Sequence, residues 1–282
     1  MQIKDKFIAF IDIIGFTAMV EAAEAAGGDL TRPLELAAAL GSAAQSDKFK
    51  SHGPTTCPHS RFLQRDLDFQ VTQISDCVVI SAEVSPAGIS NLTSHCFGIA
   101  MSMLSKNALC RGHITRGSIH HENGQFVGSG YVRAYKGEGQ VAFRRESVDE
   151  GATPFIQIED PVVNYVRDET DNCVRTMFGR VTDSDGTFTA IYPFKALANI
   201  PSALITADFD FEKFLEDIRR SRGFREANLS ELAAAEAAAP SERAKAKVRH
   251  YMRGMQMVID ALHRKEAMIQ RLQQPMGRPL RG

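Results

Sequence analysis

Two aspartates, Asp12 and Asp76, are the residues of this sequence best suited to do chemistry together. Asp12 lies within the apolar run 6–13, where an ionised carboxylate is costly unless a cation or hydrogen-bond donors face it. Asp76 separates two short β-rich runs and is expected at or beside a hairpin turn. Two such carboxylates can bridge two divalent metal ions about 4 Å apart for in-line attack on phosphorus. Their oxygen ligands suit Mg²⁺ or Mn²⁺.

Each aspartate also has an ordinary structural explanation. Asp12 can be a helix cap, and Asp76 can be a simple turn residue, because aspartate is common in turns. The chain after Asp12 favours the metal-site interpretation, since Gly15 allows a turn that leaves backbone N–H groups facing outward. Such a turn leading into a helix can cradle phosphate oxygens. The combination therefore predicts a site for metal ions and a phosphorylated ligand.

The elements that must position these residues mix strands with helices. Strands are expected over 6–13, 67–73, 77–83, 110–120, 125–127, 155–158 and 187–192, and helices over 16–26, 33–44, 86–104, 129–145 and 161–167. The polar stretch 47–65 is expected to be a loop. This order predicts an α+β sandwich in which one mostly antiparallel sheet carries helices.

The composition changes after Pro201, where Ala, Glu, Lys and Arg dominate without a strand pattern. Helices are predicted over 208–220, 228–238 and 241–271, which divides the chain into residues 1–198 and a helical C-terminal segment, 199–282. The earlier of these helices are acidic and the last is basic. We therefore favour packing of the helices on each other or across a dimer, ahead of solvated faces and of nucleic-acid contact.

The bulk properties exclude several classes of protein. The net charge is −1 and 44% of residues are hydrophobic, which is ordinary for a globular chain. No run approaches the ~20 apolar residues of a membrane helix, and no secretory signal is recognisable. The five cysteines lack paired spacing and are expected to be reduced. A cytoplasmic protein without membrane or nucleic-acid partners is expected.

Four sequence blocks resemble, in the same order, the motifs of class III adenylyl and guanylyl cyclases. Residues 10–17 (Phe-Ile-Asp-Ile-Ile-Gly-Phe-Thr) resemble the first metal-binding strand. Residues 74–76 resemble the Gly-Asp hairpin of the family, with Ser75 in place of glycine. Residues 111–117 resemble the Arg-x-Gly-Ile-x-x-Gly strand, and residues 128–138 resemble the Gly…Ala…Leu-Glu helix. A class III cyclase-like sandwich with a ferredoxin-like sheet is the implied fold.

This resemblance implies roles for individual residues. Asp12 and Asp76 would bind the two Mn²⁺ or Mg²⁺ ions, with the carbonyl of Ile13 as a further ligand. Family members build each active site from two chains, so a homodimer with composite sites is implied. The phosphates of a nucleoside triphosphate would lie on the backbone amides of Ile14, Gly15, Phe16 and Thr17.

The chain departs from purine cyclases at the positions that read the base and stabilise the transition state. Thr72 replaces a base-reading Lys or Glu, and Gln125 replaces the partner Asp or Cys. Val132 aligns with the transition-state Asn and Lys136 with an Arg. A nearby cation can still stabilise charge on the α-phosphate, and we favour Arg133 or Lys136 over Arg116 for this role.

Within the wider family, the pyrimidine cyclases of bacterial antiphage (Pycsar) systems are the most similar. The residues that carry this resemblance lie in 114–117, 128–138, 154–156 and 183–186, although Phe155 replaces an expected Arg. The resemblance implies conversion of UTP or CTP, with UTP favoured, to the 3′,5′-cyclic monophosphate and diphosphate. The product would activate a separate effector protein that stops phage replication. A purine cyclase and a degenerate, nucleotide-binding cyclase homologue are the alternatives.

Overall fold

The computed structural model describes residues 2–44, 67–198 and 210–273 of the chain. The predicted loop 47–65 lies outside these ranges. The chain divides into two compact units, Met1–Pro193 and Phe194–Gly282. The boundary follows the first residue of helix α8 (Pro193–Ala198), so the rest of that helix belongs to the second unit.

Unit 1 is built on a sheet that has eight strands in the described part of the chain, in the order β2-β3-β1-β4-β6-β8-β7, with β5 paired to β4 alone. The pairing is antiparallel throughout except between β4 and β6. The predicted α+β class with a mostly antiparallel sheet is therefore confirmed. The strands are β1 (Lys4–Ile13), β2 (Phe69–Ile74), β3 (Cys77–Glu83), β4 (Cys110–Glu122), β5 (Gln125–Val127), β6 (Ile156–Ile158), β7 (Thr182–Ser184) and β8 (Thr189–Ile191).

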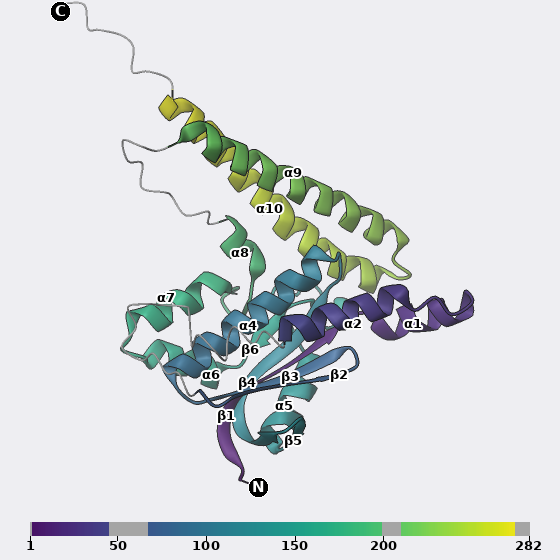
Figure 1. The fold of residues 1–282 in the computed structure, drawn as a ribbon, viewed down its shortest axis with the longest axis vertical. Coiled ribbons are helices and arrows are strands. Elements are labelled where there is room, and N and C mark those ends of the chain that lie inside the picture. Colours follow the sequence, from purple (N-terminus) through teal and green to yellow (C-terminus); the bar gives the residue numbers. More distant parts are fainter. Residues whose placement is uncertain (1, 45–66, 199–209, 274–282) are drawn as a thin grey trace, which may run out of the picture. The chain divides into compact units, whose positions relative to one another are not determined.

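Helices cover both faces of this sheet. Helices α2 and α4 pack on one face and α5 on the other (Figure 1). Besides a short 3₁₀ turn at Val148–Glu150, the helices of unit 1 are α1 (Phe16–Ala25), α2 (Thr31–Ala44), α4 (Pro86–Ser105), α5 (Ser129–Glu138), α6 (Asp160–Asp168) and α7 (Asn172–Val181).

The two faces of the sheet follow from the alternation of side chains along β1. Phe7, Ala9 and Ile11 belong to the main core, together with residues of α2 and α4. Ile8 and Phe10 belong to a smaller cluster that includes Ala134 of α5. Successive side chains of a strand point to opposite faces, so Asp12 continues the second series and lies on the α5 face. This face carries the candidate site.

Several boundaries differ from the sequence-based expectation. Helix α5 ends at Glu138 instead of 145, because the flanking Gly137 and Gly139 have low helix propensity. Helix α7 and strand β7 were not predicted. Cys77, Cys96 and Cys110 are free thiols, as predicted, whereas Cys173 is disulfide-bonded, so the expectation of five reduced cysteines was wrong.

Unit 2 contains α8 and two long helices, α9 (Phe211–Ala238) and α10 (Glu242–Gln273), which pack along each other. Helix α9 is continuous where two helices were predicted, because Gly223 is tolerated within it. Ion pairs between side chains of opposite charge connect α9 and α10. Glu266 of α10 accepts hydrogen bonds from Arg219 and Arg222 of α9. No helix in the described ranges is long and apolar enough to cross a membrane.

Candidate active site

The β2–β3 hairpin brings Asp76 next to Asp12. Asp12 pairs with Cys77 in the β1–β3 register, and the Ile13 N–H donates to the Asp76 carbonyl over 3.1 Å. The two aspartates therefore stand side by side at the ends of adjacent strands. The carboxyl group of Asp76 also raises the pKa of Asp12, as expected of two neighbouring acids. The structure therefore places the two aspartates at neighbouring positions, as a shared metal site would require.

The surroundings of Asp12 favour a cation. Burial is the largest cause that raises its pKa, followed by the negative charges of Asp76 and Glu138, and together they bring the pKa to about 7. Arg111 opposes this rise but does not overcome it. A carboxylate pair that is costly to ionise is stabilised when a metal ion neutralises it. The donor set thus fits hard divalent cations.

The metal would not depend on side chains alone. Within the described ranges no group of three or more His, Cys, Asp or Glu side chains is placed to hold an ion. A metal here would be bound by the two carboxylates, by the carbonyl of Ile13 at the same strand end, and by ligand oxygens. This is the pattern expected of Mg²⁺ sites that share a phosphorylated substrate.

A brace from helix α2 positions the hairpin tip. The side-chain amide of Gln73 donates to the carbonyls of Ala37 and Ser75, over 2.8 Å and 2.9 Å. A side chain at Gly41 of α2 would collide with this amide, since a Cβ there would lie 2.1 Å from the Gln73 Oε1. Ser75 itself has a left-handed backbone with φ of 53°, which glycine adopts more readily.

The turn after Asp12 offers fewer free amides than predicted. Gly15 has a φ of 79° and starts α1 without a side-chain cap, so the first N–H groups of the helix are available to a ligand. The N–H of Ile14, however, donates to the Leu109 carbonyl over 2.9 Å. The prediction that the amide of Ile14 binds phosphate was therefore wrong. Gly15, Phe16 and Thr17 remain as candidates.

The cation beside the aspartates is Arg111, which was not predicted as a site residue. It pairs with Asp12 in the β1–β4 register, and its guanidinium forms an ion pair with the buried Glu138. Both residues lie in the sequence blocks that resemble cyclase motifs, and this position was the one indication in the sequence that linked them to the site. Their contact joins residues 27 positions apart, so local sequence patterns do not reveal it.

The predicted cations are distributed differently. Arg133 donates to the Arg116 carbonyl over 3.3 Å and lies 3.8 Å from a Glu159 carboxylate oxygen, so it does not join Asp12. Arg116 itself pairs with Asp5 over 2.8 Å. Lys136 is exposed at the end of α5. The structure thus brings neither Arg133 nor Arg116 into the charge environment of Asp12.

Thr72 lies on the α5 face, but its partner is not Gln125. The Thr72 hydroxyl is hydrogen-bonded to His121 Nε2 over 2.9 Å. Gln125 is exposed and pairs with Glu122 in the β4–β5 hairpin. His121, one of eight histidines, carried no local signal of this role.

An aromatic surface adjoins the aspartates. The rings of Phe10 and Tyr135 lie 5.3 Å apart, and Tyr131 packs on Phe126 at 4.6 Å. Tyr135 is 55% exposed and Val132 is 44% exposed. This part of α5 can therefore contact a ligand or another chain.

The last motif of the pyrimidine-cyclase resemblance has a structural role. Asp183 forms an ion pair with Arg144 over 2.6 Å. Asp185 accepts backbone hydrogen bonds from Arg144, Thr187 and Phe188. These bonds outweigh burial and lower the pKa of Asp185. The motif stabilises the β7–β8 turn.

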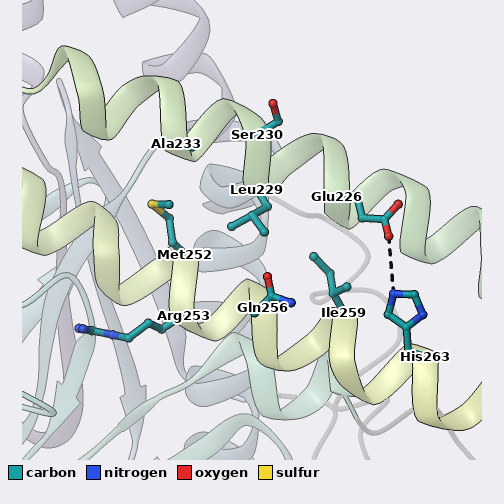
Figure 2. Close-up of a pocket in the computed structure, with 9 residues that line it drawn as sticks. All are labelled: Glu226, Leu229, Ser230, Ala233, Met252, Arg253, Gln256, Ile259 and His263. Carbon is teal, nitrogen blue, oxygen red and sulfur yellow. Dashed lines mark ion pairs between the residues drawn. The ribbon is translucent and has the colours of Figure 1, made fainter.

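Unit 2 has a hollow of about 710 Å³ between α9 and α10. Figure 2 shows Leu229, Met252 and Ile259 on its lining, with Glu226 and His263 facing each other at one end. Their carboxylate oxygen and Nε2 are 3.9 Å apart. Among the described residues of this lining Glu226 is the one acid, so the hollow does not resemble the carboxylate pair of unit 1.

Comparison with known proteins adds no relative. No model of a known protein family matches the chain, and no curated protein matches it. The functional argument therefore depends on the motifs and geometry of unit 1.

Proposed function

We propose that unit 1 is a nucleotide cyclase that converts a pyrimidine nucleoside triphosphate, with UTP favoured over CTP, into the 3′,5′-cyclic monophosphate and diphosphate. The observation that carries this proposal is the meeting of Asp12 and Asp76 at adjacent strand ends, where burial and mutual repulsion raise the pKa of Asp12 to about 7. Two carboxylates placed in this way serve phosphoryl chemistry that uses two metal ions.

The topology around these aspartates supports a class III cyclase-like sandwich. The chain runs from β1 through α1 and α2 to the β2–β3 hairpin, and then through α4 to β4. These strands are ordered β4-β1-β3-β2 and are antiparallel. This connectivity is of the ferredoxin-like kind, which the sequence resemblance implies.

The proposed mechanism assigns each group a task. Asp12, Asp76 and the Ile13 carbonyl would hold Mn²⁺ or Mg²⁺ ions, which neutralise the phosphates and make the 3′-hydroxyl more acidic. The amides of Gly15, Phe16 and Thr17 donate to phosphate oxygens. The 3′-oxygen attacks the α-phosphorus, its proton leaves toward the carboxylate pair, and the bond to the diphosphate oxygen breaks. Because the attack is intramolecular, positioning supplies much of the acceleration.

A homodimer with composite sites is part of this proposal. Within one chain Arg133 is engaged by Glu159, Arg116 by Asp5 and Arg111 by Glu138, which supports a transition-state cation supplied by a second copy. Lys136 is exposed on α5 beside the exposed Val132 and Tyr135, which supports contact of this helix with a partner. The cyclic product would then activate a separate effector protein in the cytoplasm during antiphage defence.

The test is turnover of the purified chain with each of the four ribonucleoside triphosphates and Mn²⁺, followed by separation of the products. We expect cyclic UMP as the main product. Asp12→Ala and Asp76→Ala should abolish it, whereas Asp5→Ala, on the same strand as Asp12, should retain it. Cyclase activity that persists in Asp12→Ala would overturn the proposal, and a cyclic purine product would favour a purine cyclase.

A second candidate is a degenerate cyclase homologue that binds nucleotides without turnover. The observation that favours it is the engagement of Arg133 by Glu159, together with Val132 at the position of the transition-state Asn. It predicts that UTP with Mn²⁺ raises the melting temperature while no cyclic product forms. The retained metal-site aspartates favour the active enzyme.

A further inference from the structure

A chain of three hydrogen-bonded side chains crosses the α5 face of the sheet. His121 Nε2 lies 2.9 Å from the Thr72 hydroxyl, and His121 Nδ1 lies 2.9 Å from the Ser81 hydroxyl. Ser81 and His121 are buried, whereas Thr72 is half-buried and can meet a ligand. We call this chain the Thr72–His121–Ser81 relay.

The relay lies close to the carboxylates along the sheet. Thr72 pairs with Val79, which pairs with Phe10, so Thr72 is level with Phe10 on β1. Phe10 precedes Asp12 by two residues, or about 7 Å of strand. A nucleotide whose phosphates lie at Asp12 therefore has its base within range of Thr72.

The curl of β4 makes this contact possible. In the β1–β4 register Ile119 is opposite Lys4, so a straight strand would carry His121 past the start of β1. His121 instead contacts Thr72 and Ser81, which are level with Phe10 and Ile8. The end of β4 thus bends back over the α5 face.

The hydrogen atoms of the relay can be assigned from its partners. Burial, aided by the positive charge of Lys6, lowers the pKa of His121 to about 4, so the ring is neutral near pH 7. A neutral imidazole has one N–H donor and one bare nitrogen acceptor. One terminal hydroxyl of the relay must therefore donate to the ring, and the other must accept from it.

Ser81 decides between these two arrangements. Its side chain is fully buried, and His121 is its side-chain partner in the part of the chain that the structure describes. If Nδ1 carried the hydrogen, the Ser81 O–H would be a buried donor without an acceptor, which is costly. If Ser81 donates to a bare Nδ1, every donor of the relay is used inside the protein except the Thr72 O–H.

We propose that His121 and Ser81 fix Thr72 as a hydrogen-bond donor and thereby make it select uracil over cytosine. This inference rests on the proposed cyclase function. The two bases differ at the 4-position, where uracil has a carbonyl that accepts and cytosine has an amino group that donates, and at N3, where the polarity is reversed; the proposal places Thr72 opposite the 4-position. The Thr72 O–H donates to the carbonyl of uracil. Opposite the amino group of cytosine the O–H would lose this acceptor, so a site built around one polar pattern disfavours the other. Thr72 is the specificity residue, and His121 is a positioning residue.

The neighbours of His121 hold its ring in place for this task. Phe126 packs edge-on against the imidazole with ring centroids 5.5 Å apart, and Tyr131 packs on Phe126 at 4.6 Å. Such contacts restrict rotation of the ring. The orientation of the relay is thus fixed by packing before any ligand arrives.

The experiment compares kcat/KM for UTP and for CTP in the full chain with Mn²⁺. We expect Ser81→Ala, which does not touch the substrate, to lower the UTP-to-CTP ratio about tenfold, the scale of one hydrogen bond. Ser81→Thr keeps the hydroxyl and should retain the UTP-to-CTP ratio of the unaltered chain. Thr72→Val should remove the preference, and Ser118→Ala, an exposed control on β4, should leave it unchanged. An unchanged ratio in Ser81→Ala would overturn the relay.

A second measurement is independent of turnover. NMR of the chain labelled with ¹⁵N-histidine should show His121 with the hydrogen on Nε2 and a bare Nδ1, and a hydrogen on Nδ1 would overturn the assignment. If no triphosphate is turned over, the cyclase proposal fails. Calorimetric binding of UTP and CTP with Mn²⁺ then tests the relay separately, and equal affinities in the unaltered chain would contradict it.

Discussion

Asp12→Asn should make the metal-free protein more stable while it abolishes the proposed cyclase activity. Asparagine has nearly the shape of aspartate but no charge, so the variant relieves both the burial of charge and the repulsion from Asp76. The folded-state pKa of Asp12 is about 7 against an ordinary value of 3.8. The folded chain thus binds this proton more tightly than the unfolded chain, and stability is lost as the pH rises from about 4 to about 7.

The size of the effect follows from this difference. Each tenfold change in proton affinity corresponds to about 1.4 kcal/mol, which gives a ceiling of about 4 kcal/mol. Asp12 is only partly buried at the strand end, so solvent screening reduces the expected gain to about 1–2 kcal/mol. In a unit of this size, 1 kcal/mol shifts the melting temperature by about 2–4 °C.

Scanning calorimetry in EDTA at pH 5 and at pH 8 measures this gain. The variant should exceed the unaltered protein in melting temperature by much more at pH 8 than at pH 5, because most of the penalty of the ionised Asp12 develops between pH 5 and about pH 7. Mn²⁺ should raise the melting temperature of the unaltered protein more than that of the variant. Asp5→Asn, which removes only a surface ion pair with Arg116, is the control. The reasoning is refuted if Asp12→Asn is less stable at pH 8, or if its gain is equal at both pH values.

Three further perturbations test other parts of unit 1. Ser75→Gly should raise the free energy of unfolding by about 0.5 kcal/mol in urea titrations, because glycine relieves the left-handed backbone at the hairpin tip but adds freedom to the unfolded chain; a loss of stability would contradict this. Arg111→Met should cost about 3 kcal/mol in the same assay, because it leaves the carboxylate of Glu138 buried and unpaired. Adding Glu138→Leu should recover most of that loss, and equal instability of the double variant would exclude the charge explanation. His121 should contribute the opposite pH dependence to Asp12: as the pH falls from about 6.5 to about 4, the unfolded His121 ring takes up a proton that the folded ring resists, and stability is lost. In the Asp12→Asn background, thermal melts should show this acid destabilisation, and adding His121→Asn should weaken it.

The sequence was sufficient to predict the carboxylate pair and the class of fold. Asp12 interrupts an apolar strand and precedes a glycine, and Asp76 separates two β-rich runs, so each aspartate carries a local signal. The mostly antiparallel sheet followed from strand and helix order. Helix α7 was missed although Val174, Phe178 and Val181 have the spacing of a buried helix face.

The partners of the site residues could not be predicted in the same way. Arg111 meets Glu138 and Arg133 meets Glu159 through contacts between distant elements, and helix phase alone does not identify such partners. Ile14 is not available to a phosphate because its N–H donates to the carbonyl of Leu109, a residue far away in the sequence. His121 reaches Thr72 because a strand bends, and no composition rule predicts that bend.

The bend of β4 separates the part of the strand beside the aspartates from the part that contacts Thr72. Arg111 lies at one end of this strand and His121 at the other. Between them Gly117 packs on Gly130 of α5, where a Cβ would lie 3.0 Å from the Gly130 Cα. A substitution that straightened the strand here would withdraw the imidazole from Thr72 and leave the aspartates in place. If unit 1 is the proposed cyclase, a change at this one glycine contact would alter which nucleotide is selected and leave the proposed metal site unchanged.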